Sequence, residues 1–556
     1  MSRVFNRYGP AAWFTAAAAV ILLCCYAAVW ATPAAGLVHD DGIYIATAKA
    51  IANGDGYVMP NLPGSPPQTK FPPLFPFLLS LLWRLNPKFP DNVRLLKIIP
   101  VASVFLTSAL TGLIARRMSF SRWNAWLIAL FFAAIPSSLY FSGLVMSETL
   151  YAALASLAIL LLLRAEADGS WRSVVLAAVA TIAAYYTRTA AIALVLGGAL
   201  ALASRRRWAQ CGIFLALCYG LALLPWQLWQ GQQAPAPLTE SYYTSLSYRQ
   251  FNIVSGFTIP QKISILRQNI RFLGDDITYL LFTPPRYISW AYIPFCAAIA
   301  AGFYRLRRYR AFVMPAIVSI AMPVLWAWRP QRFIIPSMGF LVIALVAAAP
   351  TLRPSWVLAV LAVPVSITLA FQTADSVRKG IPAITLNRYP DNWKQVFEID
   401  RWLSANSRPD AVVISALDPL VYLGSGRKSI RAFYVDPLPI FYGIPSSIDA
   451  GAEFSRVMRT YKPEYIVKLQ PDFFADRFVG KPIQEALCAG LIEPAFASGH
   501  FQIYRVVRSR WEREGGYKSL SSGEINKTVR KMAEASIPGA SSAGQSKRGK
   551  PDDYGY

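Results

Sequence analysis

Long apolar stretches recur from residue 11 to residue 371, and no other feature constrains the fold as strongly. A helix of about 20 apolar residues is long enough to cross the hydrocarbon core of a bilayer. Only 15% of the 556 residues are charged, whereas about 25% is usual in soluble proteins. We therefore expect a polytopic α-helical membrane protein with about 11 transmembrane helices, at residues 11–30, 95–115, 123–141, 149–163, 174–186, 190–203, 210–229, 288–304, 312–328, 333–349 and 356–371.

The short connections between these stretches indicate an orientation. If the N-terminus is cytoplasmic, every cytoplasmic connection is basic, namely residues 116–122, 164–172, 205–208, 305–310 and 351–353. Because cytoplasmic loops carry an excess of Lys and Arg, this pattern places the region after residue 371 outside the cytoplasm. The net charge of +25 is then an orientation signal, and no nucleic-acid partner is expected. Residues 3–35 also resemble a signal peptide, but an apolar run of roughly 20 residues is more typical of a span.

The composition divides the chain into three regions. We expect a transmembrane catalytic domain at residues 1–372, with outer loops at 31–94 and 230–286. An extracytoplasmic α/β domain follows at residues 380–507, where helical and strand-like segments alternate. The tail at residues 508–556 is basic and poor in aromatic residues, and is predicted to be disordered.

The outer loops have features of their own. Residues 43–53 have the spacing of an amphipathic helix that lies along the membrane surface. Residues 72–85 are apolar but too short to span, which indicates an interfacial or re-entrant piece. In the second loop, residues 263–282 have helical spacing, and the segment before them is rich in Tyr, Ser and Gln, which is typical of a mobile loop.

The cysteines and histidines exclude several chemistries. Five of the six cysteines lie inside apolar runs, and no pair has the CxxC spacing of a metal site. His39 and His500 are the only two histidines. A disulfide framework, a zinc site and a Ser-His-Asp triad are therefore not expected.

Three carboxylates lie where apolar stretches meet the outer side. Asp40 and Asp41 follow the first stretch, and Glu148 begins the fourth. One interpretation is helix capping, because acidic residues are favoured at helix N-termini and Ser147 precedes Glu148. The other is a general base at a site within the membrane. The two are compatible, since a helix N-terminus can orient a carboxylate.

Four cations share the outer side with these acids: Lys70, Arg188, Arg329 and Arg332. Lys70 is either an interfacial anchor or a ligand for phosphate. The arginines oppose the orientation bias, and their guanidinium groups suit bidentate binding of a lipid phosphate. Together the charges predict a reaction on a phosphate-bearing lipid. The cations would stabilise the leaving phosphate, and a carboxylate would take the proton of an acceptor hydroxyl or amine.

These residues resemble a known superfamily. The sequence DDGIYIATAKAIANGDGY after the first span is similar to the first outer loop of GT-C glycosyltransferases, in the branch of protein O-mannosyltransferases and lipid A aminoarabinose transferases. The matching positions are Asp40, Asp41, Tyr44, the Gly-x-x-Tyr turn ending at Tyr57, Lys70–Leu74, Ser147–Thr149, Thr187–Arg188 and Arg332–Pro336. Phe71 separates Lys70 from the Pro-Pro pair, which departs from the family pattern.

The resemblance implies a function. Family members use polyprenyl-phosphate sugars and act on the periplasmic or lumenal side, so the implied protein is a hexosyl- or pentosyltransferase of the inner (plasma) membrane. Asp40 matches the general base, and Asp41 and Glu148 complete the catalytic acids. Tyr44, Tyr57, Lys70, Arg188, Arg329 and Arg332 are the implied substrate-binding residues. The acceptor is a lipid, a glycan or a protein. Metal use differs between branches, so no metal ligand is assigned and a divalent metal is left open.

Two other classes remain as alternatives. A transporter or flippase of lipid-linked substrates would also carry charged residues within the membrane region. Such proteins often have internal repeats, whereas this sequence shows no clear repeat and its candidate acids lie at the ends of spans. A non-catalytic scaffold with a partner-binding outer domain is the third reading. Loss of sugar transfer on substitution of Asp40, with normal expression, would separate the first reading from both.

Overall fold

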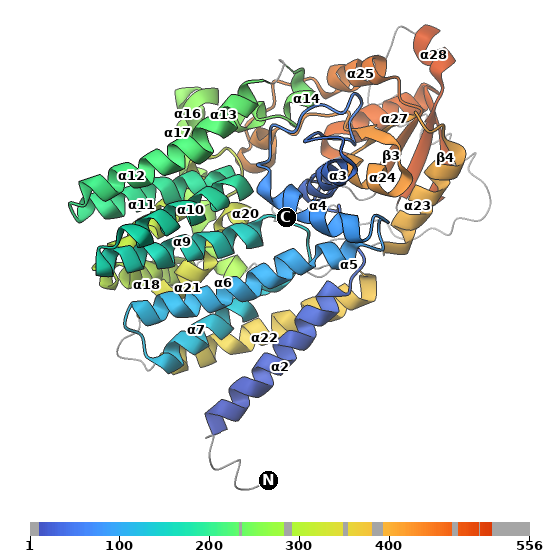
Figure 1. The fold of residues 1–556 in the computed structure, drawn as a ribbon. Helices are drawn as coiled ribbons and strands as arrows, with labels where there is room; N and C mark the ends of the chain where they lie inside the picture. The colour runs from blue at the N-terminus through green and yellow to red at the C-terminus, as the bar shows by residue number, and fades with distance from the viewer. Residues whose placement is uncertain are drawn as a thin grey trace.

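The computed structural model describes residues 10–232, 236–282, 292–348, 354–380, 393–469, 476–499 and 501–513. A large helical part comes first, and a smaller part built on a β-sheet follows it (Figure 1). The predicted α-helical architecture with a C-terminal α/β region is therefore confirmed in outline. Most of the tail that is expected to be disordered lies outside the described residues.

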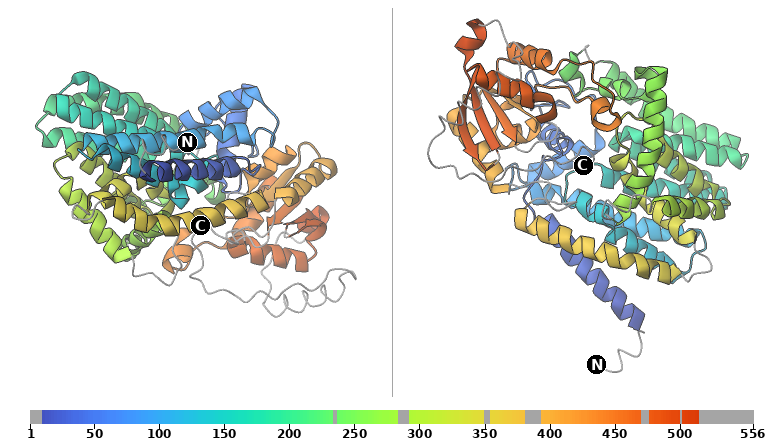
Figure 2. Two further views of the ribbon diagram at one scale, coloured as in Figure 1. Left: turned by 90° about the horizontal axis from the view of Figure 1, so that it is seen from below. Right: turned by 180° about the vertical axis from the view of Figure 1, so that it is seen from behind.

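The helical part contains most of the secondary structure. Its helices are α2 (Pro10–Trp30), α3 (Asp40–Asn53), α4 (Leu74–Leu85), α5 (Val93–Leu96), α6 (Ile98–Arg117), α7 (Arg122–Ala134), α8 (Pro136–Ser142), α9 (Glu148–Asp168), α10 (Trp171–Thr187), α11 (Ile192–Ser204), α12 (Trp208–Cys218), α13 (Leu224–Gly231), α14 (Leu238–Ser241), α15 (Leu246–Gln250), α16 (Ile253–Gly256), α17 (Ile259–Phe282), α18 (Tyr292–Arg305), α19 (Arg310–Ala321), α20 (Gln331–Ile334), α21 (Met338–Ala347) and α22 (Pro354–Lys379). Short helical turns join several of them, at Thr189–Ala191, Tyr219–Leu223, Met322–Leu325 and Ile335–Ser337. Figure 2 shows that α2 and α22, from opposite ends of this part, lie side by side.

Within the described residues, three helices are long and apolar enough to cross a membrane: Val93–Arg117, Glu148–Asp168 and Trp208–Gly231. The pair α7 and α8 is apolar enough when taken together and is bent by 58°, which fits either a broken span or a re-entrant loop. The bend follows from Pro136, whose ring cannot continue the helix that precedes it. The expected stretch at 123–141 is thus two helices, and the start of the stretch at 288–304 lies outside the described residues.

Small residues let these helices pack closely, as is usual in membranes. A Cβ atom built on Gly197 of α11 would lie 2.3 Å from the Cα of Pro315 in α19. A Cβ on Gly302 of α18 would lie 1.8 Å from the carbonyl oxygen of Ala344 in α21. Both glycines are therefore required by the approach of the neighbouring backbone.

The first outer helix differs from the expectation of a surface helix. In α3, residues Asp40 to Ala48 are all buried, because α4 packs on one side and α24 of the C-terminal part covers another (Figure 1). A Cβ atom on Gly42 would lie 2.8 Å from the Cβ of Pro419, at the start of α24. Helix α4 instead has an exposed apolar face, which includes Phe77 and Leu85. The apolar spacing of α3 thus reflects burial by protein on several sides.

The second outer loop contains short helices, which its composition does not predict. Helices α14, α15 and α16 lie in the segment that was expected to be mobile. Tyr243 is 1% exposed. Glu240 accepts hydrogen bonds from Arg456 at 2.6 Å and from Tyr461 at 2.8 Å, and both donors belong to the C-terminal part. Contacts with that part therefore hold the loop.

The C-terminal sheet has five strands in the order β2-β1-β3-β5-β4. They are β1 (Val412–Ser415), β2 (Lys428–Ile430), β3 (Tyr465–Leu469), β4 (Ile492–Ser498) and β5 (Phe501–Val506). Strand β1 is parallel to β2 and β3, whereas β5 is antiparallel to β3 and β4. The helices of this part are α23 (Trp393–Asn406), α24 (Asp418–Ser425), α25 (Ala450–Tyr461), α27 (Lys481–Cys488) and α28 (Arg508–Arg513), with short turns at Leu438–Tyr442 and Asp476–Gly480. Helix α24 begins just beyond the carboxyl end of β1, which directs it toward α3.

Candidate functional site

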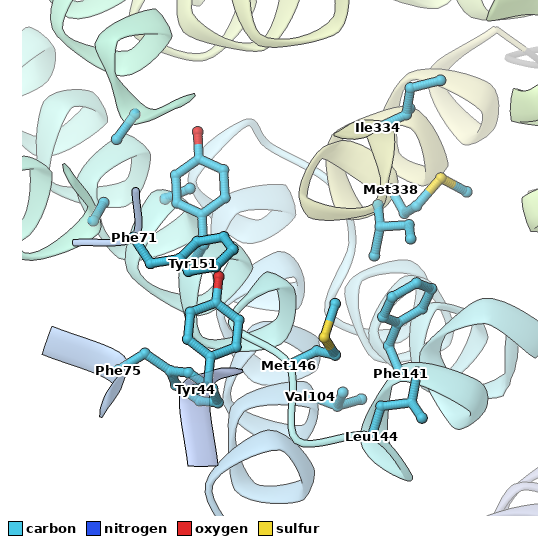
Figure 3. Packing of buried hydrophobic residues seen from close by; sticks show 14 of the residues in the cluster. Tyr44, Phe71, Phe75, Val104, Phe141, Leu144, Met146, Tyr151, Ile334 and Met338 are labelled. Carbon is cyan, nitrogen blue, oxygen red and sulfur yellow. The ribbon is translucent and has the colours of Figure 1, made fainter. Parts of the chain in front are cut away.

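The candidate site lies at the N-terminus of α3, where the helical part meets the C-terminal part. His39 is the N-cap residue, and Asp40 and Asp41 form the first turn. One turn later, the Tyr44 hydroxyl lies 2.9 Å from the hydroxyl of Ser147. Figure 3 shows Tyr44 packed beside Phe71 and Phe75 in an apolar cluster. This cluster fixes the direction in which the first turn of α3 points.

Asp41 is engaged with the backbone. It is fully buried. One carboxylate oxygen accepts the N–H of Gly36 at 2.7 Å, and the other accepts those of Val38 and Gly42 at 3.0 Å. Burial raises the pKa of Asp41 to about 6, although these N–H groups oppose the rise. The geometry therefore gives Asp41 the role of holding the loop before α3.

Asp40 belongs to a chain of alternating charges. The Nη2 of Arg332 donates to Asp40 Oδ2 at 2.5 Å, and its Nε donates to Glu148 Oε1 at 2.5 Å. Arg188 Nη1 lies 2.9 Å from the same oxygen of Glu148 and donates to Ser147 Oγ at 3.0 Å. Glu148 Oε2 is buried and has no hydrogen-bond partner in the described part of the chain. Four of the residues predicted from the sequence are thus in direct contact.

The charged side chains around Asp40 keep its carboxylate ionised. Burial alone would raise the pKa of Asp40. The positive charge of Arg332, with that of Lys70, outweighs that effect and holds the pKa of Asp40 well below its ordinary value. An ionised carboxylate that is 8% exposed is chemically suited to accept a proton.

Lys70 lies close enough to act on Asp40, but its direct contacts are with Tyr242. Its Nζ donates to the Tyr242 carbonyl at 2.8 Å and lies 3.7 Å from the centre of the Tyr242 ring. Within the described residues Lys70 forms no salt bridge. Arg431 from the C-terminal part lies 5.0 Å from the same ring. A buried lysine without a carboxylate partner leaves positive charge that an anionic ligand can satisfy.

The remaining predicted residues have other environments. Tyr57 donates to the Phe71 carbonyl at 2.6 Å, so it fixes the turn that carries Lys70. Arg329 pairs with Asp276 of α17 at 2.6 Å. No contact joins Arg329 to Asp40 or Glu148 in the described structure, so the structure separates it from the cluster of Arg332 and Arg188.

Four residues around the candidate site were not predicted from the sequence. His39 Nε2 lies 2.8 Å from Asp418 Oδ1, at the start of α24. Asp418 Oδ2 accepts a hydrogen bond from Asn61 at 2.8 Å, and Arg431 Nε lies 3.6 Å from Asp418 Oδ1. A sequence signal did exist, because His39 directly precedes the acidic pair. Its partner is 379 residues away, and no local pattern predicts that distance.

The donor set does not define a metal centre. Among the described residues, no group of three or more His, Cys, Asp or Glu side chains is arranged to hold a metal ion. The acids are paired instead with arginines or backbone N–H groups. What the site does provide is one ionised carboxylate beside several cations.

The fold of this chain is similar to that of GT-C glycosyltransferases, as the sequence resemblance predicts. It is similar in particular to two crystal structures of ArnT, a lipid A aminoarabinose transferase, from Cupriavidus metallidurans. The structure bound to undecaprenyl phosphate has a TM-score of 0.56 at 14% identity, covering 89% of this chain and 98% of that one. The apo structure has a TM-score of 0.53 at 13% identity, covering 88% and 98%. No protein-family profile and no curated protein matches the sequence.

Proposed function

We propose that the protein is an integral-membrane glycosyltransferase that moves one sugar from a polyprenyl-phosphate donor to an acceptor outside the cytoplasm. The observation that carries the proposal is the ion pair between Arg332 and Asp40, with Lys70 nearby and, among the described residues, in no salt bridge. It combines a base that stays ionised with positive charge for a phosphate. The likeness to an ArnT structure bound to undecaprenyl phosphate supports this class of donor.

The proposed chemistry is a single displacement at the anomeric carbon. The acceptor hydroxyl or amine forms the new bond to this carbon while the bond to the phosphate oxygen breaks. Asp40 takes the acceptor proton, and the leaving phosphate keeps the electron pair. Lys70 stabilises the charge that develops there. One carboxylate base and direct displacement give inversion of configuration.

The other charged residues are assigned supporting roles. Glu148 orients Arg332 and Arg188 through one oxygen, and its free Oε2 can accept a hydrogen bond from a hydroxyl of the substrate. Asp41 holds the loop that presents Asp40. The catalytic step therefore depends on Asp40 directly and on the other acids through geometry.

We also propose the topology predicted from the sequence, with 11 spans, the site and the C-terminal part outside, and residence in the inner (plasma) membrane. Support comes from the basic connections, which all lie on one side under this arrangement. The acceptor is a lipid, a glycan or a protein. The C-terminal part covers α3 and would limit which acceptor reaches Asp40.

The test is sugar transfer by the purified full chain from synthetic short-chain polyprenyl-phosphate sugars in detergent, with products identified by mass spectrometry. To choose the donor and acceptor to be tested, lipids and glycans are first compared by mass spectrometry between cells with and without the gene. Asp40→Asn keeps the shape and removes the proton acceptor, so transfer should fall roughly 10²–10⁴-fold. Asp55→Asn is the matched control, because Asp55 is an exposed carboxylate just beyond the end of α3. Near-normal turnover of Asp40→Asn would overturn the assignment.

A further inference from the structure

We infer that His39 is a positioning and proton-relay residue for Asp40, and that Asp418 of the C-terminal part holds it for this task. The inference rests on the proposed transfer reaction. His39 lies between two carboxylates: its Nε2 is 2.8 Å from Asp418 Oδ1, and its Nδ1 is 3.7 Å from Asp40 Oδ1. The side chains of His39 and Asp418 are 5% and 0% exposed, so water does not readily reach the pair.

The hydrogen bonds around Asp418 define which ring nitrogen carries the proton. Asp418 accepts from the side-chain N–H of Asn61 and faces Arg431, which is the environment of an ionised carboxylate. An ionised Asp418 requires His39 Nε2 to donate. The neutral ring then has its lone pair on Nδ1, on the side of Asp40.

The gap between His39 and Asp40 fits this assignment. Nδ1 is buried and has no hydrogen-bond partner in the described structure. In the resting site both Nδ1 and the ionised Asp40 are acceptors, so no hydrogen bond forms and the atoms stay 3.7 Å apart. A proton that Asp40 takes from the acceptor supplies the missing donor. Its transfer to Nδ1 gives an imidazolium between two carboxylates and returns Asp40 to the ionised state.

The backbone of His39 is strained, which is typical of a residue with a functional role. His39 has φ 68° and ψ −56°, a region that side chains rarely adopt. It occupies the N-cap of α3, where the side chain of Ser, Thr, Asp or Asn would stabilise the helix by accepting a backbone N–H. The His39 side chain makes no such cap hydrogen bond. Such backbone strain persists where surrounding contacts over-determine it, and it clusters at functional sites.

The groups around His39 and its two carboxylate neighbours come from five other segments of the chain. The rings of Tyr242 and Tyr243 lie 5.7 Å and 5.9 Å from the imidazole. Arg431 backs Asp418, while Arg332 and Lys70 act on Asp40. Within this set, the neutral imidazole is the side chain with a nitrogen lone pair. His39 Nδ1, 3.7 Å from Asp40 Oδ1, is therefore the nitrogen placed to receive the transferred proton.

The first experiment is chemical rescue. His39→Gly removes the ring and tolerates the positive φ, so the fold is expected to survive. We expect kcat for transfer to fall at least 10-fold, with the donor KM within twofold, and added imidazole to restore part of kcat in a concentration-dependent way. Asp418→Asn should also lower kcat, whereas Asp410→Asn, an exposed carboxylate of the same part, should not. Wild-type kcat in His39→Gly, or a folded variant that imidazole does not rescue, would overturn the inference.

The second experiment does not depend on transfer. With His500→Gln, His39 is the single histidine, and ring ¹⁵N chemical shifts report its tautomer in detergent-solubilised full-length protein. We expect the proton on Nε2, and we expect Asp418→Asn to change this signal. A proton on Nδ1 in the presence of Asp418 would overturn the relay. A wild-type chain that transfers no sugar from any polyprenyl-phosphate donor would overturn the proposed function and leave the tautomer result standing.

Discussion

Arg332 donates a 2.5 Å hydrogen bond to Asp40, a residue 292 positions earlier in the chain. This contact joins the short helix α20 to the first turn of α3 and sets the charge state of the proposed base. The same guanidinium reaches Glu148 at the start of α9. The Arg332 side chain therefore connects three helices that are distant in sequence, namely α3, α9 and α20.

Arg332→Gln should move the acid limb of the pH profile of kcat/KM for sugar transfer to higher pH. The base acts when ionised, so activity is lost as pH falls through the pKa of Asp40. Arg332 is the largest influence that lowers this pKa, and without it burial raises the pKa. An opposite charge at this distance shifts a carboxyl pKa by about 1–3 units. The measurement is kcat/KM between pH 4 and 8, with Arg329→Gln as the control because Arg329 pairs with Asp276. An unmoved acid limb would contradict the prediction.

Lys70→Ala should weaken use of the donor. Hydrogen bonds to charged groups contribute about 1.5–3 kcal/mol, which corresponds to roughly 10- to 150-fold in donor KM. Arg206→Ala and Arg308→Ala are controls, because both residues lie in connections assigned to the cytoplasmic side. The assay varies the concentration of a short-chain polyprenyl-phosphate sugar. Equal losses in all three variants would indicate general destabilisation and move the phosphate site elsewhere.

Asp41→Asn should lower the thermal stability of the protein. The asparagine amide can accept with its oxygen, but its NH₂ group would face an N–H that Asp41 now satisfies. Leaving a buried donor unpaired costs about 1–3 kcal/mol. The measurement is Tm in detergent, compared with Asp55→Asn at the other end of α3. An unchanged Tm would mean that the loop before α3 does not depend on this carboxylate.

Asp400→Asn should stabilise the protein at neutral pH. Burial raises the pKa of Asp400 well above its ordinary value, so the folded state binds a proton more tightly than the unfolded state. Stability is then greatest below the unfolded pKa and declines as pH rises toward the folded pKa. The Asn variant lacks this decline, so its advantage in Tm should grow between pH 4.5 and 8. A constant difference across this range, or a lower Tm at pH 8, would contradict the prediction.

A reporter fused after Gly380, at the end of α22, should report an extracytoplasmic location. The basis is the set of basic connections, which the positive-inside rule assigns to the cytoplasm. The matched control is a fusion after Arg206, in one of those connections. A cytoplasmic signal after Gly380 would place the C-terminal part on the wrong side for the proposed reaction.

The local part of the site was predictable from the sequence. Charges at the ends of apolar stretches are unusual, and this singled out Asp40, Glu148, Arg188 and Arg332, which the structure brings into one chain. Arg329 also lies at the outer end of an apolar stretch, but it pairs with Asp276. The orientation bias predicts the side of the membrane on which a charge lies and does not predict its partner. The burial of α3 was missed for a related reason: its covering surface comes from α24, and a single helix pattern does not reveal what packs on it.

The Gly42–Pro419 contact has a consequence for protein engineering. The two parts of the chain meet with no room for a single methyl group at this point, so they are matched surfaces and not modules joined by a linker. A chimaera that took residues 393–513 from a distant homologue would need the positions facing His39, Asn61 and Gly42 to be exchanged with them. Under the proposed function, acceptor choice and catalytic competence would therefore change together in such a chimaera.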